Sequence, residues 1–354
     1  MGNVKKNLFI VQSPFQLISA IEARDYFKSE YAILILQYSG KQHKNSALQM
    51  QQLINQFNNF DEVIEIQPVS GVLESNLRLL FILKMLQLKS IEFGKIFIGE
   101  YRSWYHTFFW NVLVSEEDFV LDDGSVIIEL QKNYIPTRKY YDISTGIKRK
   151  LKLFFFKLIS MLFIDSKDHF HRDIHLFTCF DLAPYHPNQR VIKNNFSVIK
   201  KLSKTKSVDE SKIYFFGACL SELNILSRNQ EFAALEKVNN YYKSKNKELI
   251  YISHRRETGE KLDLLWQMFD LSVLSFSNPA EIQFLLMDSL PFGIASFYST
   301  ALFTVSKMFN FNSVESFLLP VDLIPQAYRK NIISVYAEYK KFMTVMDLNE
   351  ISTE

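Results

Sequence analysis

Cysteine is nearly absent from this chain, and so are long apolar runs. The only cysteines, Cys179 and Cys219, form neither a disulfide framework nor a Cys-x-x-Cys motif, so we expect a reducing compartment. No apolar run reaches about 18 residues, which predicts that no helix spans a membrane. The apolar stretch near the N-terminus is too short for a secretory signal, and Lys6 breaks the myristoylation pattern.

Net charge is small as well. A formal charge of +3 argues against a protein that binds nucleic acid by neutralising phosphates, so we expect no nucleic-acid partner. The apolar fraction of 47% and the charged fraction of 22% are typical of a folded soluble protein. Neither repeats nor low-complexity tracts occur, whereas aromatic residues are abundant, with 32 Phe and 17 Tyr.

The first half of the sequence alternates between strand-like and helix-like segments. A strand over Leu8–Val11 precedes a helix from Pro14 to Phe27, for which Ser13 is the predicted N-cap. Further predicted strands are Ala32–Leu36, Val63–Ile66, Lys95–Ile98 and Phe119–Leu121, and further predicted helices are Ser46–Phe57 and Leu77–Leu88. This alternation predicts βαβ units and a mostly parallel sheet.

The second half repeats the pattern, so the length of 354 residues favours two domains. Its predicted strands are Lys212–Phe216, Glu248–Ile252, Leu271–Leu274 and Phe292–Ala295, and its predicted helices are Glu231–Lys243 and Ser299–Met308. We therefore expect an α/β protein with two Rossmann-like domains that face a central cleft. The predicted divisions are an N-terminal domain over 1–183, a linker over 184–211, a C-terminal domain over 212–325 and a C-terminal helix over 326–354.

Asp122-Asp123-Gly124 follows the predicted strand that ends at Leu121. Ligands of open α/β sheets bind at the carboxyl ends of strands, and a carboxylate there can act as a general base. Two adjacent carboxylates could also bind Mg or Mn, or they could simply cap a polar turn. The motif alone leaves these three interpretations open.

Ser253-His254-Arg255-Arg256 follows a second apolar strand. Arginine offers a planar fork that matches phosphate, and histidine can donate a proton near neutral pH. The alternative is a solvated charge cluster in which Glu257 pairs with an arginine. Phosphate binding is the more specific interpretation.

Ser299 and Thr300 stand between a third strand and a helix. Free N–H groups at a helix N-terminus bind phosphate, and hydroxyls add donors, although plain N-capping by Ser299 would give the same pattern. Together with the His/Arg cluster, these groups could neutralise a leaving monophosphate without a metal ion. That combination favours the general-base interpretation of Asp122 and Asp123.

In this order, the motifs resemble those of the bacterial sialyltransferases, which carry an acidic pair followed by Gly, a His-Pro motif and a Ser-Ser/Thr motif. Arg255 stands where the family usually has Pro. The segment from Gln12 to Leu17 is also similar to the Ser/Thr-Pro-x-Gln-Leu start of lipooligosaccharide and polysialic-acid sialyltransferases. The resemblance extends from about residue 8 to residue 310 and implies a GT-B glycosyltransferase fold.

The resemblance implies an inverting transfer of sialic acid from CMP-sialic acid to a galactoside-type acceptor, with neither a cofactor nor a metal ion. Asp122 or Asp123 would deprotonate the acceptor hydroxyl, and His254 would bind or protonate the phosphate of CMP. The predicted donor-binding residues are Ser253, His254, Arg255, Arg256, Glu281, Ser299, Thr300 and Gly217, where Glu281 would bind the ribose hydroxyls. The predicted acceptor-side residues are Ser13, Gln16, Glu100 and Arg102.

Three other features of the sequence are less specific for a function. His169, His171 and His175 have loose spacing for a metal site and no accompanying cysteine. The literal His-Pro at His186 lies in the predicted linker without a preceding strand. Cys219 has no assignable activating base, so a buried small residue is the expected role.

A basic and apolar segment over 148–164 points towards a membrane surface. Five cations next to an apolar run are typical of an amphipathic helix in the interface of an anionic leaflet, although a core helix with snorkelling lysines fits equally well. The first interpretation predicts a peripheral protein on the cytoplasmic face of the inner membrane, with a lipid-linked oligosaccharide acceptor. The alternatives are a transferase for another nucleotide-activated sugar, or a non-catalytic scaffold of polysaccharide assembly.

Overall fold

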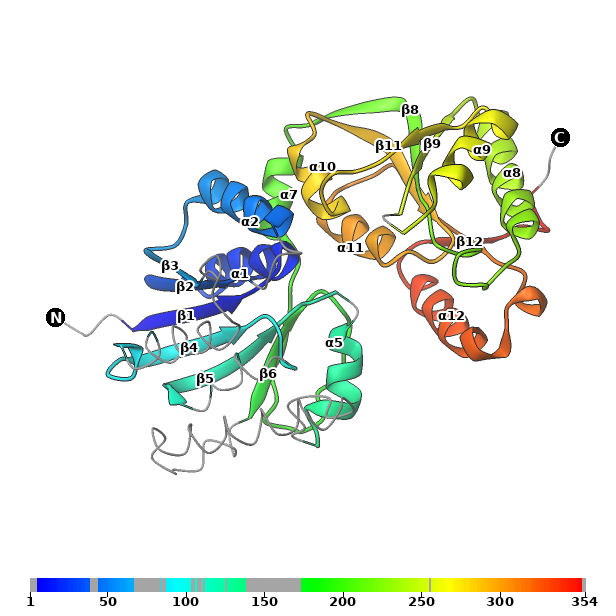
Figure 1. Ribbon diagram of the computed structural model, residues 1–354. Coiled ribbons are helices and arrows are strands. Elements are labelled where there is room, and N and C mark those ends of the chain that lie inside the picture. The colour runs from blue at the N-terminus through cyan, green and yellow to red at the C-terminus, as the bar shows by residue number, and fades with distance from the viewer. Residues whose placement is uncertain are drawn as a thin grey trace, which may run out of the picture. The chain divides into compact units, whose positions relative to one another are not determined.

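The structure is a computed structural model that describes residues 5–38, 44–66, 84, 87–102, 106, 110, 112–124, 126–137, 173–254 and 256–351 (Figure 1). It divides into two compact units, residues 1–198 and 199–354. The predicted helix over Leu77–Leu88 and the segment over 148–164 lie largely or wholly outside the described residues.

Unit 1 is built on a seven-stranded parallel sheet in the order β3-β2-β1-β4-β5-β6-β7. Its strands are β1 (Lys6–Val11), β2 (Tyr31–Gln37), β3 (Glu62–Ile66), β4 (Glu92–Ile98), β5 (Val114–Leu121), β6 (Ile174–Thr178) and β7 (Val191–Lys193). The strand order reverses between β1 and β4, as in a Rossmann sheet, and this reversal is where such sheets bind ligands.

Helices of unit 1 connect these strands and cover the sheet. They are α1 (Pro14–Tyr26), α2 (Lys44–Phe57), α5 (Val126–Glu129), the π-helical turn Leu130–Tyr134 and α7 (Ser197–Ser203), the last of which continues into unit 2. Ser13 caps α1 as predicted, because its hydroxyl accepts a hydrogen bond from the Gln16 N–H. The residues after β1 are therefore held in place at the reversal point of the sheet.

Unit 2 contains a six-stranded parallel sheet in the order β10-β9-β8-β11-β12-β13, which has the same reversal between β8 and β11. Its strands are β8 (Ser207–Phe216), β9 (Glu248–Ile252), β10 (Ser272–Leu274), β11 (Ser289–Ser296), β12 (Ser313–Leu318) and β13 (Thr344–Asp347). Its helices are α8 (Arg228–Ser244), α9 (Gly259–Phe269), α10 (Ala280–Leu286), α11 (Thr300–Met308) and α12 (Gln326–Tyr339). In Figure 1, α8 and α9 lie on one side of this sheet and α10 and α11 on the other.

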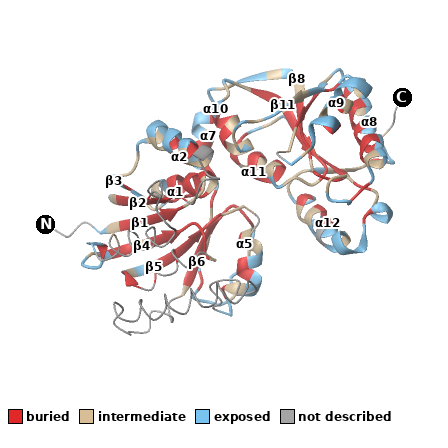
Figure 2. Cartoon of the chain, in the orientation of Figure 1, coloured by how far each residue is buried: buried red, intermediate tan, exposed pale blue. Residues whose placement is uncertain are grey.

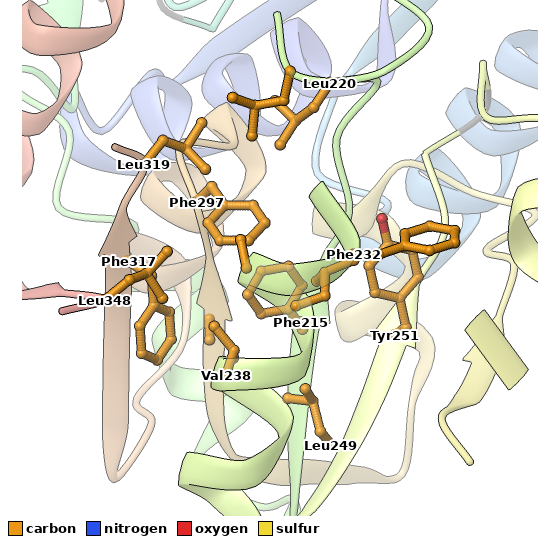
Figure 3. Close-up of a cluster of buried hydrophobic side chains, with 14 of the residues drawn as sticks. Phe215, Leu220, Phe232, Val238, Leu249, Tyr251, Phe297, Phe317, Leu319 and Leu348 are labelled. Atoms are coloured by element: carbon orange, nitrogen blue, oxygen red, sulfur yellow. The ribbon is translucent and has the colours of Figure 1, made fainter. Parts of the chain in front are cut away.

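The central strands of both sheets are buried, whereas the outer faces of the helices are exposed (Figure 2). In unit 2, rings in or directly after three neighbouring strands form the middle of the core, and Figure 3 shows Phe215, Phe297 and Phe317 close together there. The ring centroids of Phe215 and Phe297 are 5.1 Å apart in an edge-on arrangement. These contacts fix the carboxyl ends of β8, β11 and β12 relative to one another.

Two of the predicted segments, the linker and the C-terminal helix, differ from the structure. The stretch 184–211 is not a plain linker, since it contains β7, α7 and the start of β8. Its few apolar side chains are the reason: Phe196 and Ile199 are fully buried, and the Glu22 carboxylate accepts the Val198 N–H at the start of α7. The linker prediction rested on the average polarity of this stretch, so it missed the buried Phe196 and Ile199 and the contact between Glu22 and Val198.

The predicted C-terminal helix over 326–354 is also only partly correct. The helix ends at Tyr339, and Thr344–Asp347 then form β13, which pairs in parallel with β12. The β-branched Thr344 and Val345 suit a strand, and pairing covers an edge that β12 would otherwise expose.

The predicted α/β fold with two Rossmann-like domains is confirmed, because both sheets are parallel and share the reversed strand order. Within the described part of the chain, no helix has the length and apolar character needed to cross a lipid bilayer.

Candidate active site

Polar residues of unit 1 gather where β1, β4 and β5 end. Gln16 lies in the first turn of α1 after β1, Glu100 follows β4, and Asp122 and Asp123 follow β5. The three strands are neighbours in the sheet, and the reversal point lies between β1 and β4. The structure therefore brings the predicted acidic pair next to three of the predicted acceptor-side residues, Gln16, Glu100 and Arg102.

Asp122 is completely buried and fixes the backbone. Its Oδ2 accepts the N–H of Cys179 at 2.7 Å, which ties the end of β5 to the end of β6. Its Oδ1 has no hydrogen-bond partner among the described residues. Burial raises the pKa of Asp122 to about 6, although contacts with Thr178 and Cys179 oppose the shift. A carboxylate with no exposed surface cannot reach a substrate hydroxyl.

Asp123 is the accessible member of the pair, with a half-buried side chain. Burial and the negative charge of Glu100 raise the pKa of Asp123 to about 7, while a hydrogen bond from Gln16 and the charge of Arg102 oppose the shift. A carboxyl group that is half ionised near neutral pH is well matched to general-base catalysis. The geometry therefore singles out Asp123 rather than Asp122 as the candidate base.

Glu100 owes its charge to Arg102. Burial would raise the pKa of Glu100, but hydrogen bonds from the Arg102 side chain and backbone lower it below its usual value. The guanidinium donates to both carboxylate oxygens, from Nε to Oε1 at 3.1 Å and from Nη2 to Oε2 at 3.0 Å. The two carboxyl groups interact: the Arg102 contacts favour the charged form of Glu100, and the negative charge of Glu100 raises the pKa of Asp123.

His106 supports this loop, a role that its sequence surroundings did not indicate. Its Nδ1 accepts the Glu100 N–H at 3.2 Å, and burial lowers the pKa of His106 to about 4, so the imidazole is neutral. Gln16 is held as firmly, since its Oε1 accepts the Gln12 N–H at 2.9 Å. It fills the space that a Cβ at Gly99 would occupy, 2.3 Å from the Gln16 Oε1. Ser13 serves as the helix cap.

In unit 2, His254 lies in a tight turn at the end of β9. The turn is closed by a hydrogen bond from the Glu257 N–H to the His254 carbonyl at 2.9 Å. His254 Nδ1 accepts the Arg256 N–H at 3.2 Å, which places the proton of the neutral imidazole on Nε2. The Nε2–H group could then donate a hydrogen bond to a phosphate oxygen. Glu257, which the solvated-cluster alternative would pair with an arginine, pairs with Lys261 in the described part of the chain, which does not include Arg255.

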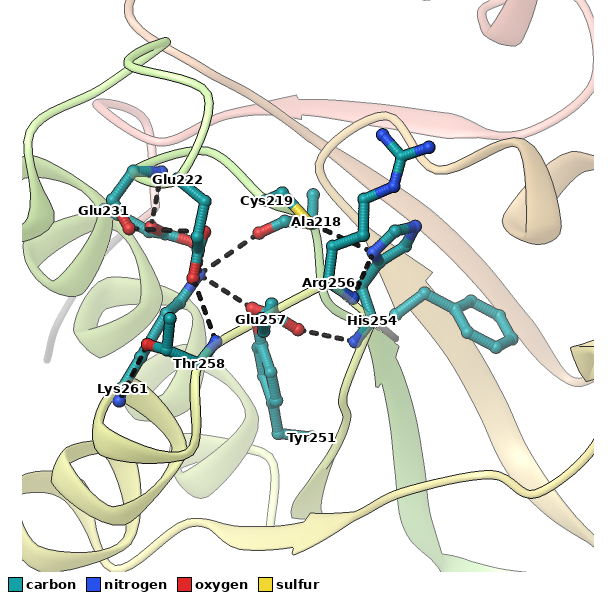
Figure 4. A network of polar contacts seen from close by, with 12 residues as sticks. Ala218, Cys219, Glu222, Glu231, Tyr251, His254, Arg256, Glu257, Thr258 and Lys261 are labelled. Carbon is teal, nitrogen blue, oxygen red and sulfur yellow. Dashed lines mark hydrogen bonds and ion pairs between the residues drawn. The ribbon is translucent and has the colours of Figure 1, made fainter. Parts of the chain in front are cut away.

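Cys219 lies against the same imidazole, with its Sγ 3.0 Å from His254 Nδ1 (Figure 4). The thiol is buried as predicted, but the contact with a histidine was missed because the two residues are far apart in sequence. Burial, with nearby Glu257 and Glu222, raises the pKa of Cys219, so the thiol is neutral. Position 217 has no room for a side chain, because a Cβ there would lie 2.4 Å from the Tyr251 hydroxyl oxygen.

The start of α11 lies across the sheet reversal from Gly217. Ser299 occupies the N-cap position, but among the described residues its side chain makes no capping hydrogen bond. Its backbone is held instead, by the Ser296 Oγ that accepts its N–H at 3.2 Å and by the Tyr339 hydroxyl that donates to its carbonyl at 2.6 Å. Thr300 is exposed at the first helical position. The hydroxyls and N–H groups are thus arranged at a rigid helix N-terminus.

Glu281 lies in the first turn of α10, where its Oε1 accepts a hydrogen bond from the Thr304 hydroxyl of α11. Burial raises the pKa of Glu281. Ser253 Oγ contacts Ser275 Oγ at 2.6 Å, and Arg256 is exposed. Arg255 lies outside the described residues.

The remaining histidine candidates are structural or outside the described part of the chain. His175 belongs to β6 and accepts the Arg190 N–H through Nδ1 at 3.1 Å, whereas His169 and His171 are not described. His186 accepts the Asn188 N–H in a turn. Among the described residues, no group of three or more His, Cys, Asp or Glu side chains could hold a metal ion.

Fold and site together define a two-domain α/β protein of Rossmann-like units, with polar clusters at the carboxyl ends of both sheets. A sequence model of the alpha-2,8-polysialyltransferase (POLYST) family matches residues 147–317, just under half of the chain. The matched segment includes His254, Glu281, Ser299 and Thr300. This similarity supports a sialyltransferase-type glycosyl transfer. No curated protein matches the chain.

Several solved structures are similar over most of the chain at low identity. MurG from Acinetobacter baumannii has 8% identity and a TM-score of 0.41, with 98% of this chain and 87% of that chain covered. MnaA from S. aureus in complex with UDP has 10% identity and a TM-score of 0.42, with coverage of 95% and 88%. Arabidopsis thaliana UGT89C1 complexed with UDP-L-rhamnose has 12% identity and a TM-score of 0.43, with coverage of 98% and 86%.

Proposed function

We propose that the protein is an inverting sialyltransferase that uses CMP-sialic acid as its donor. The observation that carries the proposal is the place of Asp123, a half-buried carboxyl group just after β5 that contacts Gln16 and Glu100, next to the reversal point of the unit 1 sheet, and has a pKa raised to about 7. The family similarity over 147–317 supports the choice of sugar. GT-B architecture is part of the same proposal.

In the proposed reaction, Asp123 accepts the proton of an acceptor hydroxyl, whose oxygen attacks the anomeric carbon of sialic acid. The bond from that carbon to the phosphate oxygen breaks, and CMP leaves with the bonding electrons. Because the donor has a β linkage, direct displacement gives an α-sialoside. Gln16 donates to Asp123, and Arg102 keeps Glu100 ionised beside it, so both residues tune the base.

In this proposal, residues of unit 2 would bind the departing phosphate. His254 Nε2–H, the Ser299 and Thr300 hydroxyls and the N–H groups at the start of α11 would donate to the phosphate oxygens. Preorganised donors of this kind stabilise charge that develops in the transition state. Glu281 would accept from the ribose hydroxyls, and Arg256 adds a positive charge next to the turn.

We extend the proposal to a lipid-linked oligosaccharide acceptor and a peripheral position on the cytoplasmic face of the inner membrane. The five cations at Lys148, Arg149, Lys150, Lys152 and Lys157 support it. Each cation near an anionic surface contributes about 1 kcal/mol to binding. Replacing all five by Gln should release the protein from vesicles that contain anionic lipid, and absence of vesicle binding by the wild type would remove this part of the proposal.

The central experiment is a transfer assay with CMP-sialic acid, read by mass spectrometry. Simple galactosides and sialylated galactosides are the acceptors to compare, because the notable family similarity is to alpha-2,8-polysialyltransferases. The expected result is addition of one or more sialic acid residues with release of CMP. Turnover with another nucleotide sugar instead would show a different transferase. Failure to bind any nucleotide would favour a scaffold.

A further inference from the structure

The turn that carries His254 is fixed from both its backbone and its side chains. The Glu257 N–H donates to the His254 carbonyl, and the Glu257 carboxylate returns the contact, since its Oε2 accepts the His254 N–H at 2.5 Å. The Arg256 N–H closes a third hydrogen bond to the imidazole. Glu257 is thus the side chain that anchors the His254 peptide group.

Glu257 is in turn fixed by a buried cluster (Figure 4), which we call the Lys261 cluster: Lys261, Glu257, Glu231 and Glu222. Glu257 Oε1 lies 2.7 Å from Lys261 Nζ and accepts the Tyr251 hydroxyl at 2.7 Å. The side chains of Lys261 and Glu257 are fully buried. Burial alone would lower the pKa of Lys261, but the charges of Glu257 and Glu231 raise it, so the ammonium stays charged.

Lys261 joins two loops of the sheet edge. Its Nζ donates to the Ala218 carbonyl at 3.2 Å, in the loop that carries Cys219, and it holds Glu257 in the loop that carries His254. Cys219 Sγ and His254 Nδ1 then meet at 3.0 Å. A buried ammonium needs such partners, because an unpaired charge is very unfavourable in a protein interior.

We propose that Glu257 is a positioning residue for His254, fixed in place by the Lys261 ammonium. The carboxylate orients the His254 peptide so that the imidazole keeps Nδ1 towards Cys219 and Arg256 and presents Nε2–H to the phosphate. The consequence for turnover rests on the proposed function, whereas the placement of the turn does not.

The test compares Glu257→Leu with Glu231→Leu, a matched control. Both changes remove one buried carboxylate from Lys261, but Glu231 otherwise accepts the Ser221 N–H, and among the described residues it forms no hydrogen bond or ion pair with the His254 turn. Hydrogen exchange read by mass spectrometry should show opening of 253–258 about tenfold or more faster in Glu257→Leu only, since a hydrogen bond to a charged group is lost there. Turnover should fall by a similar factor, with a smaller change in donor KM.

Glu257→Gln is the conservative variant, and its carbonyl oxygen can still accept the His254 N–H. It should recover much of the protection of 253–258 and of the rate, and it decides the question if Glu257→Leu does not fold. Equal effects of Glu257→Leu and Glu231→Leu on 253–258 would overturn the proposal and leave the cluster a purely stabilising role. The same holds if Glu257→Gln behaves like Glu257→Leu in both measurements. If the wild type transfers no sugar, the exchange data still decide the placement, and only the proposed function falls.

Discussion

In each unit, carboxylates lie at the carboxyl end of a Rossmann-like sheet, but the two clusters differ in the exposure of their carboxylates and in the position of their cations. In unit 1, Arg102 neutralises Glu100 and leaves Asp123 half exposed with a raised pKa. In unit 2, Lys261 lies among Glu222, Glu231 and Glu257, and the Glu231 and Glu257 side chains are essentially inaccessible. The same residue types therefore leave one carboxyl group with a raised pKa in unit 1, whereas in unit 2 they pair with a buried ammonium.

Exposure and cation placement decide between these roles. A carboxyl group next to a like charge, whose neighbouring cation already pairs with another carboxylate, has a raised pKa and can take up a proton near neutral pH. A carboxylate paired with a buried ammonium cannot exchange its proton without unpairing the charge. Each prediction below removes one element of this contrast.

The largest expected effect is that of Asp123→Asn, which removes the base but keeps the shape of the side chain. Transfer should fall by at least about 10²-fold, since general-base catalysis contributes about 10²–10⁴-fold. Affinity for CMP should stay near the wild-type value, because the proposed nucleotide-binding residues belong to unit 2. Single-turnover rates and CMP titration measure the two quantities.

Asp122→Asn is the matched control, because an amide oxygen can still accept the Cys179 N–H. We expect most of the activity to remain. Comparable losses in both variants would contradict the assignment of the base to Asp123 alone.

The sequence located both clusters but could not separate the members of the acidic pair. Its strand-end rule placed Asp122, Asp123, His254 and Ser299 correctly, because parallel strands bring their carboxyl ends to one edge of a sheet. Which carboxylate faces solvent depends on the path of the chain after β5, and adjacent residues carry no signal for it.

Contacts between distant residues were also beyond the sequence. Cys219 meets His254 only because β8 and β9 are neighbours in the sheet. The i, i+4 spacing of Glu257 and Lys261 at the start of a helix is compatible with an ion pair. Such a pair is normally exposed and contributes only about a few tenths of a kcal/mol to stability. Burial, which changes the meaning of the pair, required the fold.

The second prediction concerns pH. Since the base is active when deprotonated, the transfer rate should rise with pH until the pKa of Asp123, about 7, and fall about tenfold per unit below it. Glu100→Gln removes the negative charge beside Asp123 and frees Arg102, so both changes lower the pKa of Asp123. The acidic limb should therefore move to lower pH.

Glu117→Gln is the control for this shift, since it removes a charge from the same unit. Glu117 pairs with Lys95 and Arg190, whereas the largest causes of the Asp123 pKa shift are burial and Glu100. If the pH–rate profile moves equally in both variants, the net charge of the unit, rather than the Glu100 contact, determines the pH at which the rate falls.

The third prediction compares two glycines that follow strands in the two units. Gly217→Ala forces a Cβ to 2.4 Å from the Tyr251 hydroxyl oxygen, so overpacking should lower the free energy of unfolding by about 1–3 kcal/mol. Gly124 has open space but a φ of 64°, so Gly124→Ala should lower it by about 1–2 kcal/mol through backbone strain alone. Denaturant titration measures both, and Gly217→Ala should in addition disturb the anchored turn, because Tyr251 also donates to Glu257.

The smallest expected effect is that of metal removal, because transfer should persist in excess EDTA. Asp122 is committed to the Cys179 N–H, and Glu100 is held by both nitrogens of the Arg102 fork. A hard divalent cation needs about six oxygen ligands, and a guanidinium beside the carboxylates would repel it. In unit 2, the proposed function gives His254 and the start of α11 the role of donors to a single phosphate. Rates measured with EDTA, and again after addition of Mg or Mn, should agree. Loss of transfer in EDTA with recovery by either ion would mean that the carboxylates of unit 1 bind a metal, and that the contrast between the two clusters lies in their ligands rather than in the placement of their cations.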